Sequence, residues 1–431
     1  MSEPIGNSRE GDPPKIAATR IAAVVAGNTA EFYDFLLFAF FAPQIGRSFF
    51  PAEDSVASLL ATLAAFGSGF AMRPVGALFI GRVADRHGRV PAMRLNFLLM
   101  AMSMLGFAAL PTHAQIGAAA PIFAVILRLL QGFAIGGEVG PSTAYLIEAV
   151  PPRHRGLFAS FQFTGQNAAI LLASLIGYLL SSWMNERDLA DWGWRLAFLL
   201  GGALLCLTYP LRRNLDETLP KQPAGPVTAP MPDTRFLLLA CAVLAQATIS
   251  IYVLINMVTF AATTLSMSVR DSFLPTLAVG ITSVICCPLG GMLSDRTGRK
   301  PIMIGFAALL LLVALPGFRF VLAMQSVALL VCWCVLAAAC SSLASVTAFI
   351  SITESLPTTR RSLLLGLLYA AVVTLFGGTT PLIIAWLIVV TGTPLIPALY
   401  LTAALIVGVA AMIQMRETAP CRTRALVSTA A

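Results

Sequence analysis

The sequence predicts an all-α integral membrane protein in which twelve transmembrane helices form two pseudo-symmetric six-helix bundles, with both termini in the cytoplasm. Three observations lead to this fold class. The 431 residues are 58% hydrophobic and only 11% charged, whereas a soluble domain carries about 25% charged residues. Twelve apolar runs approach the roughly 20 residues that a membrane-crossing helix needs. The two halves of the chain also carry the same landmarks in the same order.

The apolar runs fall into two sets of six around a polar, proline-rich stretch. They lie near 19–42, 56–81, 93–111, 119–147, 157–182, 195–212, 236–262, 273–294, 301–322, 326–353, 362–388 and 395–415. We therefore expect a cytoplasmic leader (1–18), an N-terminal bundle (19–212), a cytoplasmic linker (213–235), a C-terminal bundle (236–415) and a cytoplasmic tail (416–431). The leader lacks an apolar core followed by a small-residue cleavage site, so we expect no signal peptide.

The distribution of lysine and arginine predicts the orientation of the spans. With the N-terminus inside, 21 of the 28 basic residues fall in cytoplasmic segments and five in outer segments, while Arg73 and Arg128 lie within spans. Cytoplasmic loops of membrane proteins carry such an excess of basic residues. The net charge of +8 is therefore explained by contact with the anionic lipid bilayer, and we expect no nucleic-acid partner.

Three landmarks recur between the halves. They are "GRVADRHGRV" (Gly81–Val90) with "GMLSDRTGRK" (Gly291–Lys300), the pair Glu148 and Arg155 with the equally spaced Glu354 and Arg361, and "DET" (216–218) with "RET" (416–418). Parallel six-helix repeats are typical of transporters that bind their substrate near the bilayer midplane, between the halves.

With these motifs the chain resembles a major facilitator superfamily transporter, whose best-known signature is the Gly-x-x-x-Asp-Arg-x-Gly-Arg loop. The first copy departs from that signature at Val90, where a basic residue is usual. The segments "MRPVGALFIGRVADRHGR", "RLLQGFAIGGEVG" and "DWGWRLAFLLG" resemble the metabolite:proton symporter family, which takes up citrate, 2-oxoglutarate, shikimate, proline and betaine. "LFGGTTPLI" and "TGTPLIPALY" are most similar to its citrate and tricarballylate members. The resemblance implies a monomer in the bacterial inner membrane that needs no cofactor and is driven by the proton gradient.

Ionisable side chains inside the spans are candidates for function, because each costs about 2.5–3.5 kcal/mol at a helix centre. The N-terminal spans hold Glu31, Asp34, Arg73, Arg128 and Glu138, whereas the interiors of the C-terminal spans hold no charge. We therefore expect the first half to supply the electrostatics and the second half to supply neutral groups and shape.

Depth along the helices allows Asp34 to pair with Arg128, because both lie about 12–14 Å below the outer end at 1.5 Å per residue. A carboxylate is charged while it is paired with arginine, and desolvation favours its neutral form once the pair opens. An anionic substrate that takes over the arginine would then couple its own binding to proton uptake. The related sugar-porter family has a similar pair, to which its proton coupling is attributed. We predict Asp34, Arg128, Glu31 and Glu138 for proton coupling, with fixed structural ion pairs as the alternative.

Two buried arginines indicate an anionic carboxylate substrate, because a guanidinium binds a carboxylate through two parallel hydrogen bonds. The predicted substrate-binding residues are Arg73, Arg128, Asn28, Tyr33, Gln131, Gln162, Gln166, Tyr252 and Asn256. The resemblance points to a tricarboxylate such as citrate or tricarballylate. The alternatives are a dicarboxylate such as 2-oxoglutarate and, third, a zwitterion such as proline or betaine.

The repeated loop motifs predict a separate role in conformational gating at the cytoplasmic ends of the spans. The residues concerned are Gly81, Asp85, Arg89, Glu148, Arg155, Gly291, Asp295, Arg299, Glu354 and Arg361. Charge pairs at these positions would hold the inner side closed and break during the transition. We expect them to control rate rather than substrate choice.

Other classes of protein fit the sequence poorly. No phosphate-binding loop and no nucleophile with a nearby base is visible, so we expect neither an enzyme nor an ATP-driven pump. The eight cysteines and three histidines show no metal-site spacing. A membrane sensor that does not transport would need an attached signalling domain. The longest polar stretch, the central linker (213–235), is too short to form one, so a sensor fits the sequence less well than a transporter.

Overall fold

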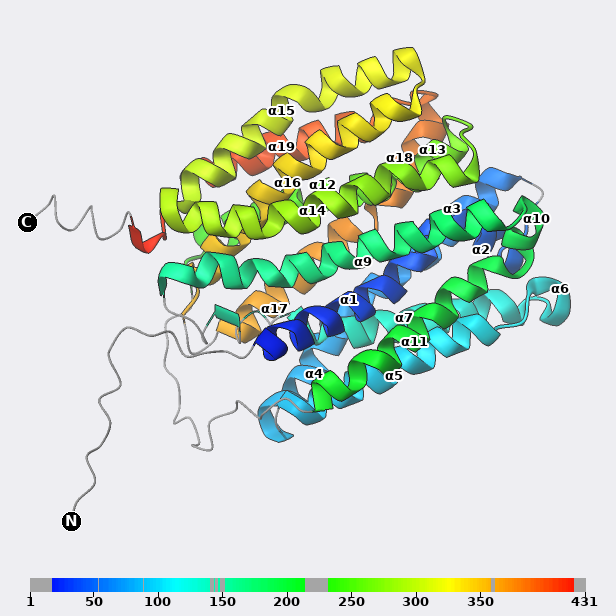
Figure 1. Cartoon of the computed structure of the whole chain (residues 1–431), viewed down its shortest axis with the longest axis horizontal. Coiled ribbons are helices and arrows are strands. Elements are labelled where there is room, and N and C mark those ends of the chain that lie inside the picture. Colours follow the sequence, from blue (N-terminus) through cyan, green and yellow to red (C-terminus); the bar gives the residue numbers. More distant parts are fainter. Residues whose placement is uncertain are drawn as a thin grey trace, which may run out of the picture.

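The computed structural model describes residues 18–52, 54–87, 89–139, 143, 146–147, 152–213, 232–357 and 361–421. Over these residues the chain is helical and forms no strand. The long helices run roughly along one common direction, and most helices of the first half lie on one side of the molecule with most of the second half on the other, while α17 lies beside α4 (Figure 1).

Helices of the first half begin and end at the following residues: α1 (Ala18–Phe40), α2 (Ala42–Phe49), α3 (Ser55–Ala71), α4 (Arg73–His87), α5 (Arg89–Ala109), α6 (His113–Ile116), α7 (Ala119–Gly136), the 3₁₀ turn η1 (Pro152–His154), α9 (Arg155–Trp183), α10 (Glu186–Asp188), the π-turn η2 (Leu189–Gly193) and α11 (Trp194–Arg213). Asp54 caps the N-terminus of α3, because its side chain accepts a hydrogen bond of 3.0 Å from the Val56 amide.

Helices of the second half are α12 (Thr234–Ile255), α13 (Met257–Thr263), α14 (Val269–Thr297), α15 (Arg299–Met324), α16 (Val327–Ser355), α17 (Arg361–Val372), the π-turn η4 (Val373–Gly377), α18 (Thr380–Thr391) and α19 (Ile396–Gln414). Ser268 caps the N-terminus of α14, because its hydroxyl accepts a hydrogen bond of 3.0 Å from the Asp271 amide.

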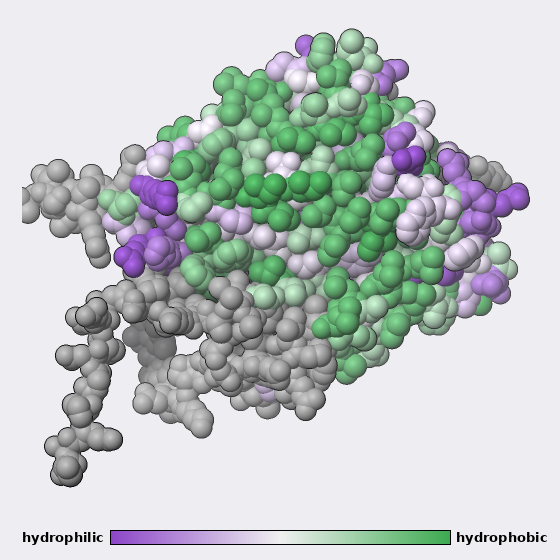
Figure 2. Space-filling view, viewed as in Figure 1, coloured by the Kyte–Doolittle hydropathy of each residue, from purple (hydrophilic) through white to green (hydrophobic). Residues whose placement is uncertain are grey.

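Ten helical segments among the described residues are long and apolar enough to cross a membrane. They coincide with ten of the twelve predicted spans. The first predicted span, α1, carries Glu31 and Asp34 and is not among the ten, and the third contributes the shorter apolar stretch Leu95–Ala109. The count of twelve therefore stays a prediction. Many large apolar side chains face outward, Leu312 at 73% exposed among them, and Figure 2 shows an apolar belt between hydrophilic ends.

Several predicted spans are interrupted instead of continuous, and the fourth has a turn at Gly137 and Glu138 after α7. The second span breaks at Met72 between α3 and α4, where Pro74 has no amide hydrogen for an unbroken helical ladder. The seventh breaks at Asn256, and the eleventh passes through the π-turn η4. Interrupted transmembrane helices commonly surround substrate sites, because their freed backbone groups line a cavity.

The two halves meet along α9 and α14, which lie against one another through the middle of the molecule (Figure 1). A small residue permits this close approach, because a Cβ atom on Gly280 would lie 2.6 Å from the backbone nitrogen of Leu171. Two large apolar clusters fill the interior, one drawn mainly from each half.

Candidate functional site

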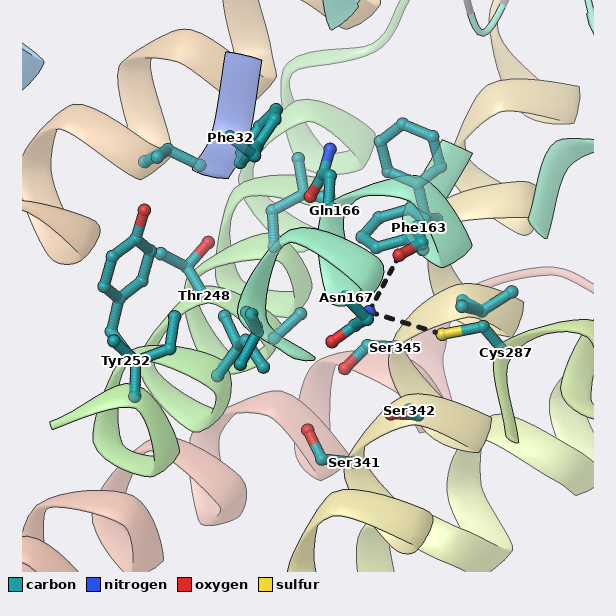
Figure 3. A pocket seen from close by; sticks show the side chains of 18 of the residues that line it. Phe32, Phe163, Gln166, Asn167, Thr248, Tyr252, Cys287, Ser341, Ser342 and Ser345 are labelled. Atoms are coloured by element: carbon teal, nitrogen blue, oxygen red, sulfur yellow. Dashed lines mark hydrogen bonds between the residues drawn. The ribbon is translucent and has the colours of Figure 1, made fainter. Parts of the chain in front are cut away.

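A cavity lies between the halves of the chain, with α1 and α9 on one side and α12, α14, α16, α17 and η4 on the other. Its polar lining consists of Gln166, Asn167, Thr248, Tyr252, Cys287, Ser341, Ser342, Ser345 and Tyr369 (Figure 3). Among the described lining residues none is charged. The second half thus contributes neutral groups, as its sequence predicts.

Asp34, Gln131 and Arg128 form a buried chain of hydrogen bonds inside the first half. Arg128 Nη1 donates to Gln131 Oε1, and Gln131 Nε2 donates to Asp34 Oδ2 at 2.8 Å. Arg128 also donates to the carbonyl oxygens of Phe35 at 3.3 Å and Phe66 at 3.5 Å. The predicted partners Asp34 and Arg128 are therefore brought together, but the Gln131 amide stands between them.

Part of this polar network has no partner. Asp34 Oδ1 and Arg128 Nε are buried and make no hydrogen bond, and both side chains are 0% exposed. A buried polar group without a partner costs about 1–3 kcal/mol, and a charged group costs more. Such groups are expected where a ligand or a proton completes the set.

Arg73 lies beside this network and is held by aromatic rings. Its guanidinium carbon sits 4.5 Å from the ring centre of Phe35 and 4.2 Å from that of Phe70. Arg128 lies 4.2 Å from the same Phe35 ring, so two cations share one aromatic side chain. Arg73 Nε and Nη2 are buried without hydrogen-bond partners, and no ion pair to either arginine is found among the described residues.

Close helix packing positions the two arginines. A Cβ atom on Gly69 would lie 2.8 Å from the Arg128 carbonyl oxygen, and one on Gly132 would overlap the Gly69 carbonyl group. These glycines let the backbones of α3 and α7 approach at the depth of Arg128. The break after Met72 then places Arg73 at the start of α4.

Tyr252 connects this charged cluster to the cavity. Its ring packs edge-on against Phe70 with ring centres 5.5 Å apart, and it lines the cavity. It is also close enough to Arg73 and Arg128 to interact with both charges. The second, seventh and eleventh spans, which are all interrupted, meet here, because Thr374 of η4 also donates a hydrogen bond of 2.8 Å to the Phe70 carbonyl oxygen.

The other predicted site residues lie in different places. Gln166 lines the cavity and accepts a hydrogen bond of 3.4 Å from the Tyr369 hydroxyl. Asn28 donates to the Gln162 carbonyl oxygen at 2.7 Å and so joins α1 to α9, while Tyr33 donates to the Ala197 carbonyl oxygen at 2.9 Å and joins α1 to α11. In this structure Asn28 and Tyr33 therefore hold helices together.

Three more predicted residues are buried outside the cavity lining. Asn256 lies at the junction of α12 and α13. Glu31 is 1% exposed on α1, and Glu138 is 6% exposed just after α7. Neither arginine lines the cavity either, so direct contact of Arg73 or Arg128 with substrate stays a prediction.

Several cavity residues did not stand out in the sequence. Thr248, Cys287, Ser341, Ser345 and Tyr369 all line the cavity. A uniformly apolar helix hides which face its small polar residues occupy. The run "CSSLAS" (Cys340–Ser345) was the available signal, because three serines within five positions are unusual in a lipid-facing helix.

At the end of α14, Asp295 reaches across to the other half. Its carboxylate accepts hydrogen bonds of 3.0 Å from the backbone amides of Gly156 and Leu157, at the N-terminus of α9, where the helix dipole favours a negative charge. It also pairs with Arg299 at 2.8 Å, and Arg299 pairs with Glu354 at 3.0 Å. Asp295, Arg299 and Glu354 of the second half are thus brought together.

The structure describes only some of the remaining predicted gating residues. Gly291 packs against Gly156, and Arg155 is half-buried at the start of α9. Gly81 lies within α4. The side chains of Asp85, Arg89 and Arg361, and the whole of Glu148, lie outside the described residues.

One residue that the sequence did not assign to the gate is Glu417. Its carboxylate accepts hydrogen bonds from the backbone amides of Arg299 at 2.9 Å and Lys300 at 3.1 Å, and the neighbouring Thr418 hydroxyl donates to Glu354 at 2.7 Å. Burial opposes the charged form, but hydrogen bonds from four backbone amides outweigh it and lower the pKa of Glu417. The "RET" landmark therefore holds the end of the chain against the gating residues.

Known proteins are similar to this chain in sequence and architecture. The "Sugar (and other) transporter" family model matches residues 19–218. A citrate-proton symporter of Salmonella typhi is 36% identical, with 91% of this chain and 92% of that protein covered. An alpha-ketoglutarate permease of Escherichia coli is 31% identical, with 84% and 85% covered.

Among solved structures, the major facilitator superfamily proton:xylose symporter XylE bound to 6-bromo-6-deoxy-D-glucose superposes with a TM-score of 0.72 over 93% of this chain and 96% of that one, at 19% identity. This likeness shows the fold. Together with the apolar helices, the matches make this chain a multi-pass protein of the bacterial inner membrane. The chain belongs to the major facilitator superfamily and, within it, to the metabolite:proton symporter family.

Proposed function

We propose that the protein is a secondary active transporter that takes up a tricarboxylate such as citrate or tricarballylate together with protons, by alternating access. The proposal includes twelve spans in two bundles with the predicted boundaries, cytoplasmic termini and a monomeric state. The proton gradient is the energy source, and neither a cofactor nor an enzymatic reaction is involved. The citrate-proton symporter of Salmonella typhi, 36% identical over almost the full length, supports this substrate class.

The observation that carries the proposal is a buried cluster with more cations than anions. When all three groups are ionised, Arg73, Arg128 and Asp34 together carry one net positive charge, and they form no ion pair among the described residues. Buried charges are stable only when they are paired. An anionic substrate in the adjoining cavity supplies the missing charge, and Arg73 has two unpartnered nitrogens, Nε and Nη2, to bind it.

Tyr252 and Phe70 separate Arg73 from the cavity in this structure. We propose that these two rings move aside when the carboxylate binds, so that Arg73 receives it. Both rings belong to interrupted spans, where a change of backbone angle costs less than within a continuous helix.

Proton coupling follows from the chain of hydrogen bonds between Arg128 and Asp34. The link is a neutral amide, Gln131, and Asp34 Oδ1 has no partner. A negative substrate near the arginines weakens their hold on Asp34, which then binds the proton and becomes neutral. Glu31 and Glu138 are the other carboxylates that could perform this role.

Gating uses the charged residues at the predicted cytoplasmic ends. Asp295 bridges the halves through the N-terminus of α9, and Arg299 and Glu354 hold it in place. Opening of the inner side must break the bonds between Asp295 and α9, because they cross from one half to the other.

The second candidate is symport of a dicarboxylate such as 2-oxoglutarate. The alpha-ketoglutarate permease of Escherichia coli, at 31% identity, favours it. A zwitterion such as proline or betaine fits the cluster less well, because its own positive charge would add to those of two arginines. A sensor without transport is the alternative from another class of protein.

The test is uptake of radiolabelled citrate into proteoliposomes under an imposed inward proton gradient, comparing the parent with Asp34→Asn. We expect the parent to need the gradient, and the variant to retain exchange but to lose accumulation. Asp191→Asn, an exposed carboxylate of η2, is the matched control and should behave as the parent.

Each outcome has a distinct meaning. If the parent takes up no citrate, the substrate assignment is wrong, and competition by dicarboxylates and zwitterions decides the replacement. Transport of none of these would favour the sensor. Full gradient-driven accumulation by Asp34→Asn would move the coupling role to Glu31 or Glu138.

A further inference from the structure

The cavity has a second polar group of residues, apart from Tyr252, whose hydrogen-bonding groups are incomplete. Asn167 on α9 and Ser345 on α16 lie together here, with Cys287 beside them (Figure 3). Asn167 Oδ1 and Ser345 Oγ are both buried and have no hydrogen-bond partner. Buried polar atoms are rarely left in this state, so two of them facing one cavity indicate a ligand group.

The orientation of the Asn167 amide follows from its other contacts. Its nitrogen donates to the Phe163 carbonyl oxygen at 2.8 Å and lies 3.5 Å from the Cys287 sulfur. A carbonyl oxygen accepts and cannot donate, so the nitrogen must face it. The amide oxygen therefore points the other way and presents an acceptor, which requires a donor from the ligand.

Ser345 is available for a ligand because it does not bond to its own helix. Serine and threonine in helices usually donate to the carbonyl oxygen four residues earlier. Thr347 and Thr353 do so on the same helix, both at 2.8 Å, whereas the Ser345 hydroxyl makes no such bond. It can donate to a ligand oxygen while Asn167 accepts from the same group.

The charge and hydrogen-bonding capacity of the ligand group decide which chemical group fits between Asn167 and Ser345. An ionised carboxylate only accepts hydrogen bonds, so between these two residues it would leave the Asn167 oxygen unsatisfied and facing a negative charge. A ketone oxygen could accept from Ser345 but would leave the Asn167 oxygen unsatisfied. A hydroxyl satisfies both, since it donates one hydrogen bond and accepts another.

We propose that Asn167 and Ser345 form a subsite for the hydroxyl group of a hydroxycarboxylate substrate. The inference rests on the proposed function, because the ionised carboxylates of the same molecule are bound toward Arg73. The subsite makes the transporter selective for hydroxy acids over their deoxy analogues. It favours citrate over tricarballylate, which differs by that hydroxyl alone, and malate over succinate.

The experiment measures inhibition of radiolabelled citrate uptake by each acid of these two pairs, for the parent protein in proteoliposomes. We expect the hydroxy acid to compete about tenfold more strongly, because the deoxy acid cannot make the hydrogen bonds and leaves the buried Asn167 and Ser345 groups unpaired. Ser345→Ala should reduce the preference to about twofold by weakening citrate and leaving tricarballylate unchanged. Asn167→Ala should act in the same direction, and the double variant should add little because both residues bind one hydroxyl.

Ser351→Ala is the matched control, because Ser351 is also a buried hydroxyl without a partner on α16 but does not line the cavity. It should keep the full preference. Equal inhibition by the two acids of each pair, or equal weakening of both acids in Ser345→Ala, would overturn the subsite while leaving carboxylate transport intact. Absence of uptake of every carboxylate would instead overturn the proposed function and this inference with it.

Discussion

Replacement of Arg73 by glutamine is the most direct test of how this protein binds an anion. Arg73 Nε and Nη2 are buried without partners and can donate two hydrogen bonds to a carboxylate. A hydrogen bond to a charged group contributes about 1.5–3 kcal/mol. Loss of both therefore costs at least about 3 kcal/mol, which is roughly a 100-fold rise in the half-saturating substrate concentration.

The substitution also removes the stacking of the guanidinium on Phe35 and Phe70, at 4.5 and 4.2 Å. Each such contact stabilises the folded protein by about 0.5–2 kcal/mol. A control must lose similar contacts away from the cavity. Arg195→Gln does this, because Arg195 lies 4.3 Å from the Trp194 ring and 5.9 Å from the Phe49 ring and does not line the cavity.

The assay is the concentration dependence of citrate uptake into proteoliposomes, with thermal unfolding measured on the same preparations. Both variants should lower the unfolding midpoint, but only Arg73→Gln should raise the half-saturating concentration. Arg73→Lys should recover part of the affinity, since lysine keeps the charge but lacks the planar fork. An unchanged half-saturating concentration in Arg73→Gln, beside a midpoint lowered as in Arg195→Gln, would refute the anion-binding role.

Three further predictions concern packing, the gate and the end of the chain. Gly132→Ala should push α3 away from α7 and lower the thermal unfolding midpoint by a few degrees, because overpacking costs about 1–3 kcal/mol. The control Gly305→Ala places its new methyl group in open space and should leave the midpoint unchanged. Equal midpoints for the two variants would contradict the packing argument. Asp295→Asn should change the maximal uptake rate several-fold and leave the relative affinities for carboxylates unaltered, since its contacts cross the halves but not the cavity; a changed substrate preference would count against a gating role. Glu417→Gln should lower the unfolding midpoint at pH 7. The pKa of Glu417 is lower in the folded protein than in the unfolded chain, where it is about 4.3, so the ionised carboxylate stabilises the fold at higher pH. The difference between variant and parent should therefore shrink as pH falls below roughly 4, where the carboxylate becomes protonated. A difference that is constant from pH 7 to pH 3 would show that the charge does not matter.

Sequence reasoning located the Asp34 and Arg128 pair but not its geometry. The spacing of residues along a helix gives their depth, and both side chains do lie within one hydrogen-bonded chain. The position of Gln131 between them depends on rotamers, which depth cannot specify. Arg73 was placed among the substrate-binding residues for its charge, yet its enclosure by Phe35 and Phe70 became visible only when α1, α3 and α4 were packed together.

The neutral half of the cavity shows the opposite case. Ser345 and Asn167 are ordinary residues in transmembrane helices, where small polar side chains usually serve helix packing or bond to their own backbone. Nothing in their spacing separates them from Thr347, which bonds to its own helix. Their significance comes from the absence of that local bond and from the cavity that they face.

What the sequence by itself determined is the membrane fold, the repeat of its landmarks between the halves and the concentration of buried charge in the first half. These properties depend on hydrophobicity and charge cost, which act residue by residue and can be read along the chain. The tertiary structure alone decided which faces meet: that Arg73 and Arg128 share Phe35, that Gln131 links Asp34 to Arg128, and that Asn167 and Ser345 lie together at the cavity. These contacts depend on how each helix is rotated about its axis and how closely glycines such as Gly69 and Gly132 allow neighbours to approach, and that rotation is set by packing between distant segments.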